Sequence, residues 1–144
     1  MAQVLAQLHA ATVKTLTSAQ RAFLENPYVG IVTDLRPDGT LHSTVVWVDV
    51  DDDGVSFNTA WPRAKPRYLR ANPRVALLVV DPGDEYRWIS ISGTATLTEE
   101  GADEQIDRLA KKYKDLDSYP WHKPHETRVS VRIAPHWIEA RGID

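Results

Sequence analysis

Five cationic residues and no acidic one occupy the segment 58–74. They are Arg63, Lys65, Arg67, Arg70 and Arg74. The segment is expected to join a strand end to a helix start, where backbone N–H groups and the helix dipole favour an anion. Arg63 and Lys65 are expected in the first turn, where they can add charge-assisted hydrogen bonds to a phosphate. Because the whole chain has a formal charge of −3, we interpret this segment as a pocket for a phosphorylated small molecule and not as a nucleic-acid surface.

A solvated helix face is the alternative explanation of the same charges. Such a face usually mixes acids among the bases, and this segment contains none. The absence of acids favours the pocket for Arg63 and Lys65. Arg67, Arg70 and Arg74 lie further along the expected helix, so for them both interpretations stay open.

Other catalytic chemistries find little support in the sequence. The chain has no cysteine, which excludes thiolate nucleophiles, disulfides, thiolate zinc sites and iron–sulfur clusters. His122 and His125 are three residues apart in a proline-rich stretch, where we expect solvated side chains and no metal. Ser43, Ser90 and Ser92 lack the G-x-S-x-G motif of a nucleophilic serine. We therefore assign neither a catalytic side chain nor a metal ligand, and any redox chemistry must use a bound organic cofactor.

Length and composition predict a single domain, residues 1–144. Hydrophobic residues make up 42% of the chain and charged residues 26%, as in ordinary soluble globular proteins. No apolar run approaches the roughly 18 residues of a membrane span, and the first residues lack the pattern of a secretory signal. We expect a cytoplasmic protein without membrane or nucleic-acid partners. Apolar positions at helical spacing predict a loosely packed N-terminal helix over 1–16.

The first half of the chain predicts a short helix followed by antiparallel strands. Thr17 or Ser18 can cap the helix, and Asn26-Pro27 ends it. Extended segments over 28–35 and 41–50 flank the turn 36–39 and predict a hairpin. A third strand over 55–59 leads into a helix with Pro62 in its first turn, which ends at Asn72-Pro73.

The second half predicts more strands around one longer helix. The apolar run 75–80 is typical of a strand buried on both faces, and residues 88–97 alternate between apolar and small polar side chains. A helix is expected to begin at Thr98 and to run through Tyr113, with Ile106, Leu109 and Ala110 on one face. An irregular connection over 115–127 and a final strand over 128–140, interrupted at Pro135, complete the chain. Together these elements predict a mainly β (α+β) fold, a barrel of six or seven antiparallel strands with two to four helices.

The motif T-A-x-x-R-A-K-x-R-x-L-R-x-N-P-R over 59–74, then D-P-G-D over 81–84 and W-I-S-I-S-G over 88–93, adds a resemblance to these expectations. In this order they resemble the pyridoxamine 5′-phosphate oxidase-like superfamily, which implies a split β-barrel of the FMN-binding type. Within it, the chain is most similar to small reductases of actinobacteria that depend on a deazaflavin, coenzyme F-420. The likeness covers residues 23–139.

The resemblance implies a homodimer with two equivalent cofactor sites at the interface. The residues that it places around the cofactor are Ser43, Thr44, Val45 and Val46 along the ring, Asn58 and Thr59 near the ribityl and phosphate groups, Arg63, Ala64 and Lys65 at the phosphate, and Tyr86, Arg87, Trp88 and Ile89 in the pocket wall. A polyglutamate tail on the cofactor would find partners in the three arginines further along the helix. The segment 138–144 does not resemble the substrate-binding end of true pyridoxamine 5′-phosphate oxidases, which argues against vitamin B6 oxidation.

By the same resemblance, the protein transfers a hydride from the reduced deazaflavin to an unsaturated or quinone-like organic acceptor. Hydride transfer depends on geometry and exclusion of water more than on an acid or base, which suits a sequence with no evident catalytic triad. Two alternatives stay open. The first is an FMN-dependent oxidase or reductase on the same fold, and the second is a non-catalytic deazaflavin carrier.

Overall fold

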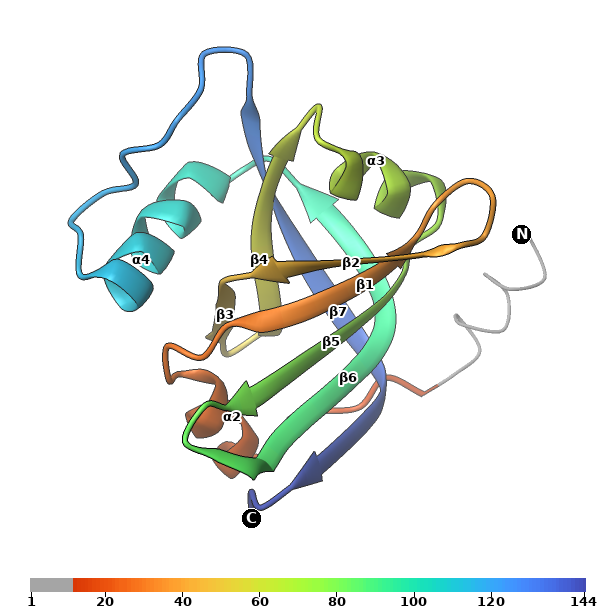
Figure 1. Cartoon of the computed structure of the whole chain (residues 1–144), viewed down its shortest axis with the longest axis vertical. Helices are drawn as coiled ribbons and strands as arrows, with labels where there is room; N and C mark the ends of the chain where they lie inside the picture. Colours follow the sequence, from red (N-terminus) through yellow and green to blue (C-terminus); the bar gives the residue numbers. More distant parts are fainter. Residues whose placement is uncertain (1–11) are drawn as a thin grey trace.

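One antiparallel sheet of seven strands curls into a half-open barrel (Figure 1). The computed structural model describes residues 12–144. Its elements are α2 (Ser18–Leu24), β1 (Gly30–Leu35), β2 (Leu41–Val46), β3 (Val48–Asp51), β4 (Gly54–Trp61), α3 (Ala64–Ala71), β5 (Arg74–Asp81), β6 (Asp84–Thr98), α4 (Ala102–Lys114) and β7 (Thr127–Arg141). The strand order is β2-β1-β5-β6-β7-β4-β3. This arrangement confirms the predicted split β-barrel with α-helical additions.

The N-terminal helix predicted over 1–16 falls mostly outside the described residues. Residues 12–17 are not helical. They lie along the barrel, where the backbone N–H of Lys14 donates to the carbonyl of Pro135 at 2.7 Å and Leu16 is buried. Thr17 then caps α2 as predicted, because its side chain accepts from the N–H of Gln20 while the Gln20 side chain accepts from the N–H of Thr17.

The strand predicted over 41–50 is two strands. The extended segment is interrupted at Trp47. As a result, β2 pairs with β1 at one edge of the sheet and β3 pairs with β4 at the other. Because a single residue joins β2 to β3, these strands can lie at opposite edges only if the sheet curls until those edges meet. At the break, Tyr113 of α4 replaces strand pairing: its ring stacks on Trp47 at 5.4 Å, and its hydroxyl oxygen accepts from the N–H of Val48 at 2.9 Å.

The core lies inside the curl, and one predicted burial pattern is wrong. In β5, Val75, Leu77 and Val79 are buried, but Leu78 and Val80 on the opposite face are 39% and 37% exposed. The run 75–80 is therefore buried on one face only. The α-helices contact other parts of the sheet and leave the outer face of β5 uncovered (Figure 1).

Two helices begin later than predicted. The first turn of α3 starts at Ala64, with Arg63 as N-cap, so Pro62 precedes the helix and Pro66 is the proline of its first turn. In α4 the N-cap is Gly101, with φ of 78°, and not Thr98. A positive φ suits glycine, and this turn leaves Thr98 as the last residue of β6.

The last strand is continuous and long. β7 runs through Pro135 without the predicted interruption, and the irregularity appears as a shift in its register with β6. Ser92 pairs with Trp137 and Gly93 with Pro135, so His136 is an extra residue, as in a β-bulge. A Cβ at Gly93 would overlap the carbonyl oxygen of Ala134, so glycine permits this close approach.

Residues 115–126 of the connection predicted over 115–127 have no helix or strand, whereas Thr127 already belongs to β7. The connection passes over the end of the molecule where β4 runs into α3 (Figure 1). Within residues 12–144, no helix combines the length and the apolarity that a membrane crossing requires.

Candidate functional site

A cleft of about 180 Å³ lies where β4, α3, α4 and the break between β2 and β3 come together. It is lined by Val45, Val46, Trp47, Asn58, Thr59, Arg63, Lys65, Ile106, Leu109, Tyr119 and Arg128. Six of the residues predicted around the cofactor are thus brought to one place. Apolar side chains from α4 and β2 form one part of the wall, and cations form another.

A larger hollow of about 430 Å³ lies on the outer face of the sheet, along β1, β5 and β6. Arg74 is its one basic lining residue, and no helix N-terminus contributes to it. The smaller cleft combines several cations with the start of α3, which is the chemistry that holds an anion. We therefore place the candidate site in the smaller cleft.

Arg63 stands at the N-terminus of α3 and already has an anionic partner. Its Nε and Nη2 atoms donate to both carboxylate oxygens of Glu126, the second at 2.8 Å. The Glu126 side chain is 6% exposed. The hydrogen bond from Arg63 holds the pKa of Glu126 below its usual value, so the carboxylate stays charged at neutral pH. Glu126 thus supplies an internal anion at the position predicted for a phosphate.

Lys65 is half-buried in the first turn of α3, next to Ala64, whose backbone begins the helix. Burial lowers the pKa of Lys65; the charge of Asp34 opposes this shift, and Arg63 and Arg128 add to it. Among the residues that the structure describes, Lys65 forms no ion pair within 4.0 Å. Its ammonium group is therefore a charged donor with capacity for a ligand.

Arg128 is a member of the cleft that the sequence did not single out. It lies at the start of β7, is 6% exposed, and donates from Nε to Oδ1 of Asn58 at 2.8 Å. Its Nη1 atom is buried and has no hydrogen-bond partner within residues 12–144. The ring of Tyr119 lies 5.0 Å from the guanidinium carbon. No local signal marks Arg128, because its partner Asn58 is 70 residues away in the sequence.

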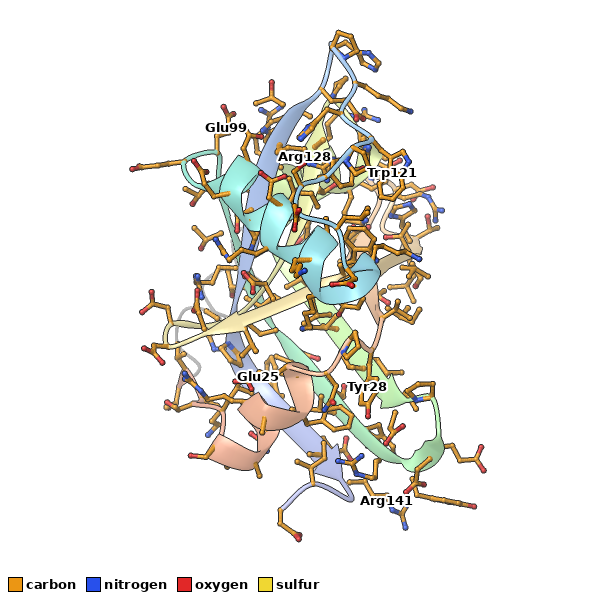
Figure 2. All side chains as sticks on the ribbon, turned by 90° about the vertical axis from the view of Figure 1, so that its left-hand side faces the viewer. Glu25, Tyr28, Glu99, Trp121, Arg128 and Arg141 are labelled. Carbon is orange, nitrogen blue, oxygen red and sulfur yellow. The ribbon has the colours of Figure 1, made fainter. Side chains whose placement is uncertain are left out.

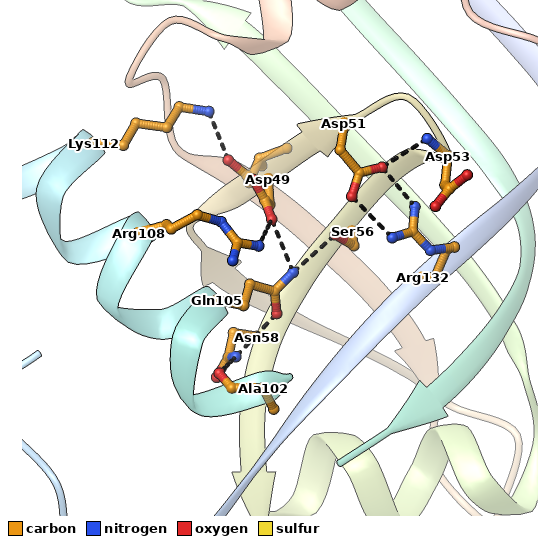
Figure 3. Close-up of polar contacts among 11 residues, drawn as sticks. Asp49, Asp51, Asp53, Ser56, Asn58, Ala102, Gln105, Arg108, Lys112 and Arg132 are labelled. Carbon is orange, nitrogen blue, oxygen red and sulfur yellow. Dashed lines mark hydrogen bonds and ion pairs between the residues drawn. The ribbon is translucent and has the colours of Figure 1, made fainter. Parts of the chain in front are cut away.

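Both the nitrogen and the oxygen of the Asn58 side-chain amide form hydrogen bonds within the protein. Its Nδ2 donates to the carbonyl of Ala102 at 2.8 Å and to Oε1 of Gln105 at 3.0 Å (Figure 3). Gln105 in turn donates to Ser56 at 2.9 Å. The predicted contact of Asn58 with a cofactor remains untested, but its side chain is already engaged in orienting Arg128. Thr59, the other residue predicted there, is 2% exposed.

The residues predicted along the ring lie on both faces of β2. Ser43 is exposed on the outer face, with its Oγ 3.0 Å from Oγ1 of Thr33. Thr44 points inward, and its buried Oγ1 has no partner within the described part of the chain. Val45 is 61% exposed, whereas Val46 is 5% exposed. Neighbouring residues of a strand point to opposite faces, so a ligand on one face cannot contact all four side chains.

The segment from Tyr86 to Ile89 lies far from the cleft in the same chain. Trp88 pairs with Arg141 at one end of β7, whereas Trp61 pairs with Thr127 at the other, which separates them by roughly 40 Å along the strand. Figure 2 shows Arg141 and Arg128 at opposite ends of the molecule.

The members of this segment also have other contacts. Arg87 forms an ion pair with Asp81, Tyr86 is exposed, and Ile89 is fully buried in the core. Each of these side chains is thus explained by its local surroundings, and one chain alone does not add them to the cleft.

Aromatic side chains close the side of the cleft nearest the 115–126 connection. Tyr119 lies edge-on to Trp47 at 6.3 Å and to Trp121 at 5.5 Å. Trp121 is 52% exposed and sits beside α4 (Figure 2). Within residues 12–144, no group of three or more His, Cys, Asp or Glu side chains could hold a metal ion. The cleft therefore offers cations, an apolar wall and aromatic rings, which suits a planar molecule with an anionic end.

Comparison with solved structures relates this barrel to two relevant proteins. An F-420 reductase superposes with a TM-score of 0.73 and 26% sequence identity, over 86% of this chain and 98% of that one. A conserved hypothetical protein from Mycobacterium tuberculosis superposes with a TM-score of 0.69 and 24% identity, over 90% of this chain and 87% of that one. The second likeness shows the fold alone.

Sequence comparison identifies the family of the chain. The chain is 37% identical over 83 residues to a pyridoxine/pyridoxamine 5′-phosphate oxidase from Rubrobacter xylanophilus. That match covers 57% of this chain and 38% of the relative, so the chain spans well under two thirds of the relative's length. The family model of pyridoxamine 5′-phosphate oxidase matches residues 16–142, which include every strand and helix described above. On this match, the chain belongs to the pyridoxamine 5′-phosphate oxidase family.

Proposed function

We propose that this protein is an oxidoreductase that uses the reduced deazaflavin coenzyme F-420 to deliver a hydride to an unsaturated or quinone-like organic acceptor. The family and the 26% identity to an F-420 reductase support a flavin- or deazaflavin-binding oxidoreductase. The observation that carries the proposal is the cleft, because it joins cations at the start of α3 to the apolar wall of β2 and α4. A phosphorylated ring cofactor has these two halves.

In this proposal the residues of the chain bind and position, and none acts as an acid. Arg63 and Lys65 hold the phosphate, with Ala64 offering its backbone at the helix start. Val45 and Val46 pack against the ring and exclude water. The bound coenzyme supplies the hydride, and the proton comes from water or a nearby hydroxyl group. The rate then depends on keeping donor and acceptor carbons roughly 3 to 3.5 Å apart.

We also propose a homodimer that completes the site. Large apolar side chains are exposed on the outer face of the sheet, namely Ile31, Leu41, Val45, Leu78, Val80 and Trp137. Contiguous exposed apolar surface often marks a protein interface. A partner chain on this face would cover Val45 at the edge of the cleft. It could also bring its own segment from Tyr86 to Ile89 to the cleft, which this segment does not reach within a single chain.

An FMN-dependent enzyme is the second candidate. The observation that favours it is the 37% identity to a pyridoxine/pyridoxamine 5′-phosphate oxidase, although that match covers 57% of this chain. The charge pattern of the cleft fits either cofactor, because both carry a phosphate on a ribityl chain. A non-catalytic deazaflavin carrier would use the same binding residues.

Titration of the purified protein with coenzyme F-420 and with FMN, at matched salt, separates these candidates. We expect saturable binding of the deazaflavin, and oxidation of its reduced form when unsaturated or quinone-like acceptors are added. Tighter binding of FMN would transfer the proposal to the second candidate. Binding without oxidation by any acceptor of a broad panel would indicate a carrier.

A further inference from the structure

The cleft holds more positive charge than the protein neutralises. Arg63, Lys65 and Arg128 bring three positive charges to it, and Glu126 is paired with Arg63 alone. Asp34 acts on Lys65 through space and offsets part of its charge, but its oxygens lie beyond 4.0 Å from the Lys65 ammonium, and Oδ1 is hydrogen-bonded to His42 at 2.7 Å. Two cations are therefore left without an ion-pair partner among the described residues. The two cations without an ion-pair partner suit a phosphate ester.

Of these cations, Arg128 is the most deeply buried. A guanidinium nitrogen without a hydrogen bond in the protein interior carries a desolvation penalty. Burial lowers the pKa of Arg128, in keeping with this cost. Its Nε is satisfied by the neutral amide of Asn58, and among the described residues no carboxylate lies within 4.0 Å of the guanidinium, so only the Tyr119 ring and the more distant Glu126 offset its charge. A ligand anion would remove this penalty.

The direction of the Arg128 side chain is fixed from the opposite side. The amide nitrogen of Asn58 donates hydrogen bonds to Ala102 and Gln105, so the amide oxygen must face Arg128. Gln105 is itself held by its donation to Ser56. This chain of hydrogen bonds runs from α4 across β4 (Figure 3). The guanidinium is therefore oriented before any ligand arrives, which reduces the entropy lost on binding.

Tyr119 covers the guanidinium in the structure. Its ring centroid lies 5.0 Å from the guanidinium carbon of Arg128, and Tyr119, Arg63 and Arg128 all line the cleft. Tyr119 and Glu126 both belong to the connection 115–126, which has no helix or strand of its own. Their oxygen atoms occupy the surroundings of two cations that a phosphate would otherwise contact. A ligand that reaches Nη1 of Arg128 must therefore displace Tyr119.

We propose that Arg128 is a specificity-determining anion ligand of the cleft, and that Asn58, held by Gln105, is its positioning residue. The ligand class is a phosphate ester. The anion site does not depend on the proposed function. Only the identification of its ligand with the phosphate of a redox cofactor rests on that function. Asn58, predicted as a direct cofactor contact, acts here through Arg128.

The experiment measures binding of phenyl phosphate, and of coenzyme F-420 and its dephosphorylated ring–ribityl fragment, by calorimetry at constant salt. Replacing Arg128→Gln is expected to weaken the two phosphate-bearing ligands about tenfold or more and to leave the dephosphorylated fragment unchanged. Arg132→Gln is the matched control, because Arg132 lies four residues further along β7 and pairs with Asp51. The control is expected to bind all three ligands as the wild type does.

Asn58→Asp distinguishes a positioning role from a structural one. An aspartate still accepts from Nε of Arg128 and compensates its charge, which offsets the two hydrogen bonds that the Asn58 amide no longer donates to Ala102 and Gln105. A folded variant is therefore expected, in which phosphate affinity falls about tenfold. Wild-type phosphate affinity in folded Asn58→Asp or Arg128→Gln protein would overturn the inference. Phosphate binding that requires Arg128, without hydride transfer from the deazaflavin, would keep the anion site and reject the proposed function.

Discussion

Two arginines on the same face of β7 have opposite surroundings. Arg132 donates two hydrogen bonds of 3.2 Å to the carboxylate of Asp51, whereas Arg128 meets the neutral amide of Asn58 and keeps a buried nitrogen unpaired. Both lie beside β4 and are four residues apart, so strand geometry does not explain the difference. The difference lies in what the neighbouring strands offer: an acid at one position and an amide at the other.

Two lysines repeat this contrast. Lys112 of α4 donates to the carbonyls of Leu24 and Val48, both at 2.6 Å, and so ties α4 to α2 and β3. Lys65 has no ion pair within residues 12–144. Arg108 of α4 likewise has a partner, because it donates to Asp49 of β3 at 3.0 Å. We call the residues satisfied within the protein the closed region, namely Asp49, Asp51, Arg108, Lys112 and Arg132. The cations of the cleft, Arg63, Lys65 and Arg128, form the open region.

The comparison separates charges that hold the fold from charges kept for a ligand. In the closed region each cation is satisfied by the protein, so a ligand has little to gain there. In the open region the protein accepts a cost in stability that a bound anion can offset, as is common at functional sites. Arg63 belongs to both groups in part, because Glu126 supplies an anion that a ligand would have to replace or accompany.

The largest expected effect is on ligand binding in the open region. Replacing Arg63 and Lys65 together with alanine is expected to weaken binding of coenzyme F-420 roughly a thousandfold, about 4 kcal/mol, because each charge-assisted hydrogen bond contributes about 1.5–3 kcal/mol. Calorimetry at low and high salt measures the loss. The salt dependence should also flatten, since screened charge pairs are what the substitution removes.

The closed region provides the control for this prediction. Arg132→Ala removes one positive charge a short distance from the cleft, and it should leave the coenzyme affinity within about twofold of the wild type. Equal losses in the two variants would show that overall charge attracts the coenzyme and would remove the distinction between the regions.

The next effect is on stability. Asn58→Leu removes the side chain that accepts a hydrogen bond from buried Arg128 and leaves Oε1 of Gln105 without the Asn58 donor, so the free energy of unfolding should fall by about 3 kcal/mol. Asp51→Leu removes a partly exposed ion pair and should cost less than about 1 kcal/mol. Urea unfolding of both variants measures the difference. Similar losses at the two positions would mean that Arg128 is no more dependent on its partner than Arg132.

Sequence periodicity predicted the parts of the fold that depend on neighbours in the chain. The apolar face of α4, with Ile106, Leu109 and Ala110, is buried as expected, and Thr17 caps α2. The side chains in these features are at most a few residues apart, so their spacing contains the information. The number of strands and the short turns predicted an antiparallel barrel, and the resemblance to a family added that it is a split barrel.

The features that the sequence did not reveal depend on distant parts of the chain. The break at Trp47 is held by Tyr113 of α4, and Arg128 is oriented by Asn58 of β4. The segment 75–80 illustrates a different limit. Its apolar residues fill both faces of a strand, but only tertiary structure shows that the face with Leu78 and Val80 is uncovered in the single chain.

The smallest expected effect concerns pH and the lysine of the closed region. Burial lowers the pKa of Lys112 to about 8, from 10.5 in the unfolded chain. Between these values the unfolded chain binds a proton that the folded chain has released, so the free energy of unfolding should rise as the pH increases from about 8 towards 10. Because Lys112 is partly exposed and therefore screened, we expect a rise of about 1 kcal/mol or less.

Tyr113 sets the upper limit of the useful pH range. Burial raises its pKa to about 12 from 10.0, so above pH 10 the folded chain keeps a proton that the unfolded chain loses, and stability falls again. Urea midpoints at about pH 7.5 and 9.5 therefore isolate the effect of Lys112. In Lys112→Met the difference between these midpoints should shrink, although the variant is less stable at both pH values. A difference unchanged from the wild type would mean that Lys112 keeps an ordinary pKa and that its two carbonyl partners fully compensate its burial.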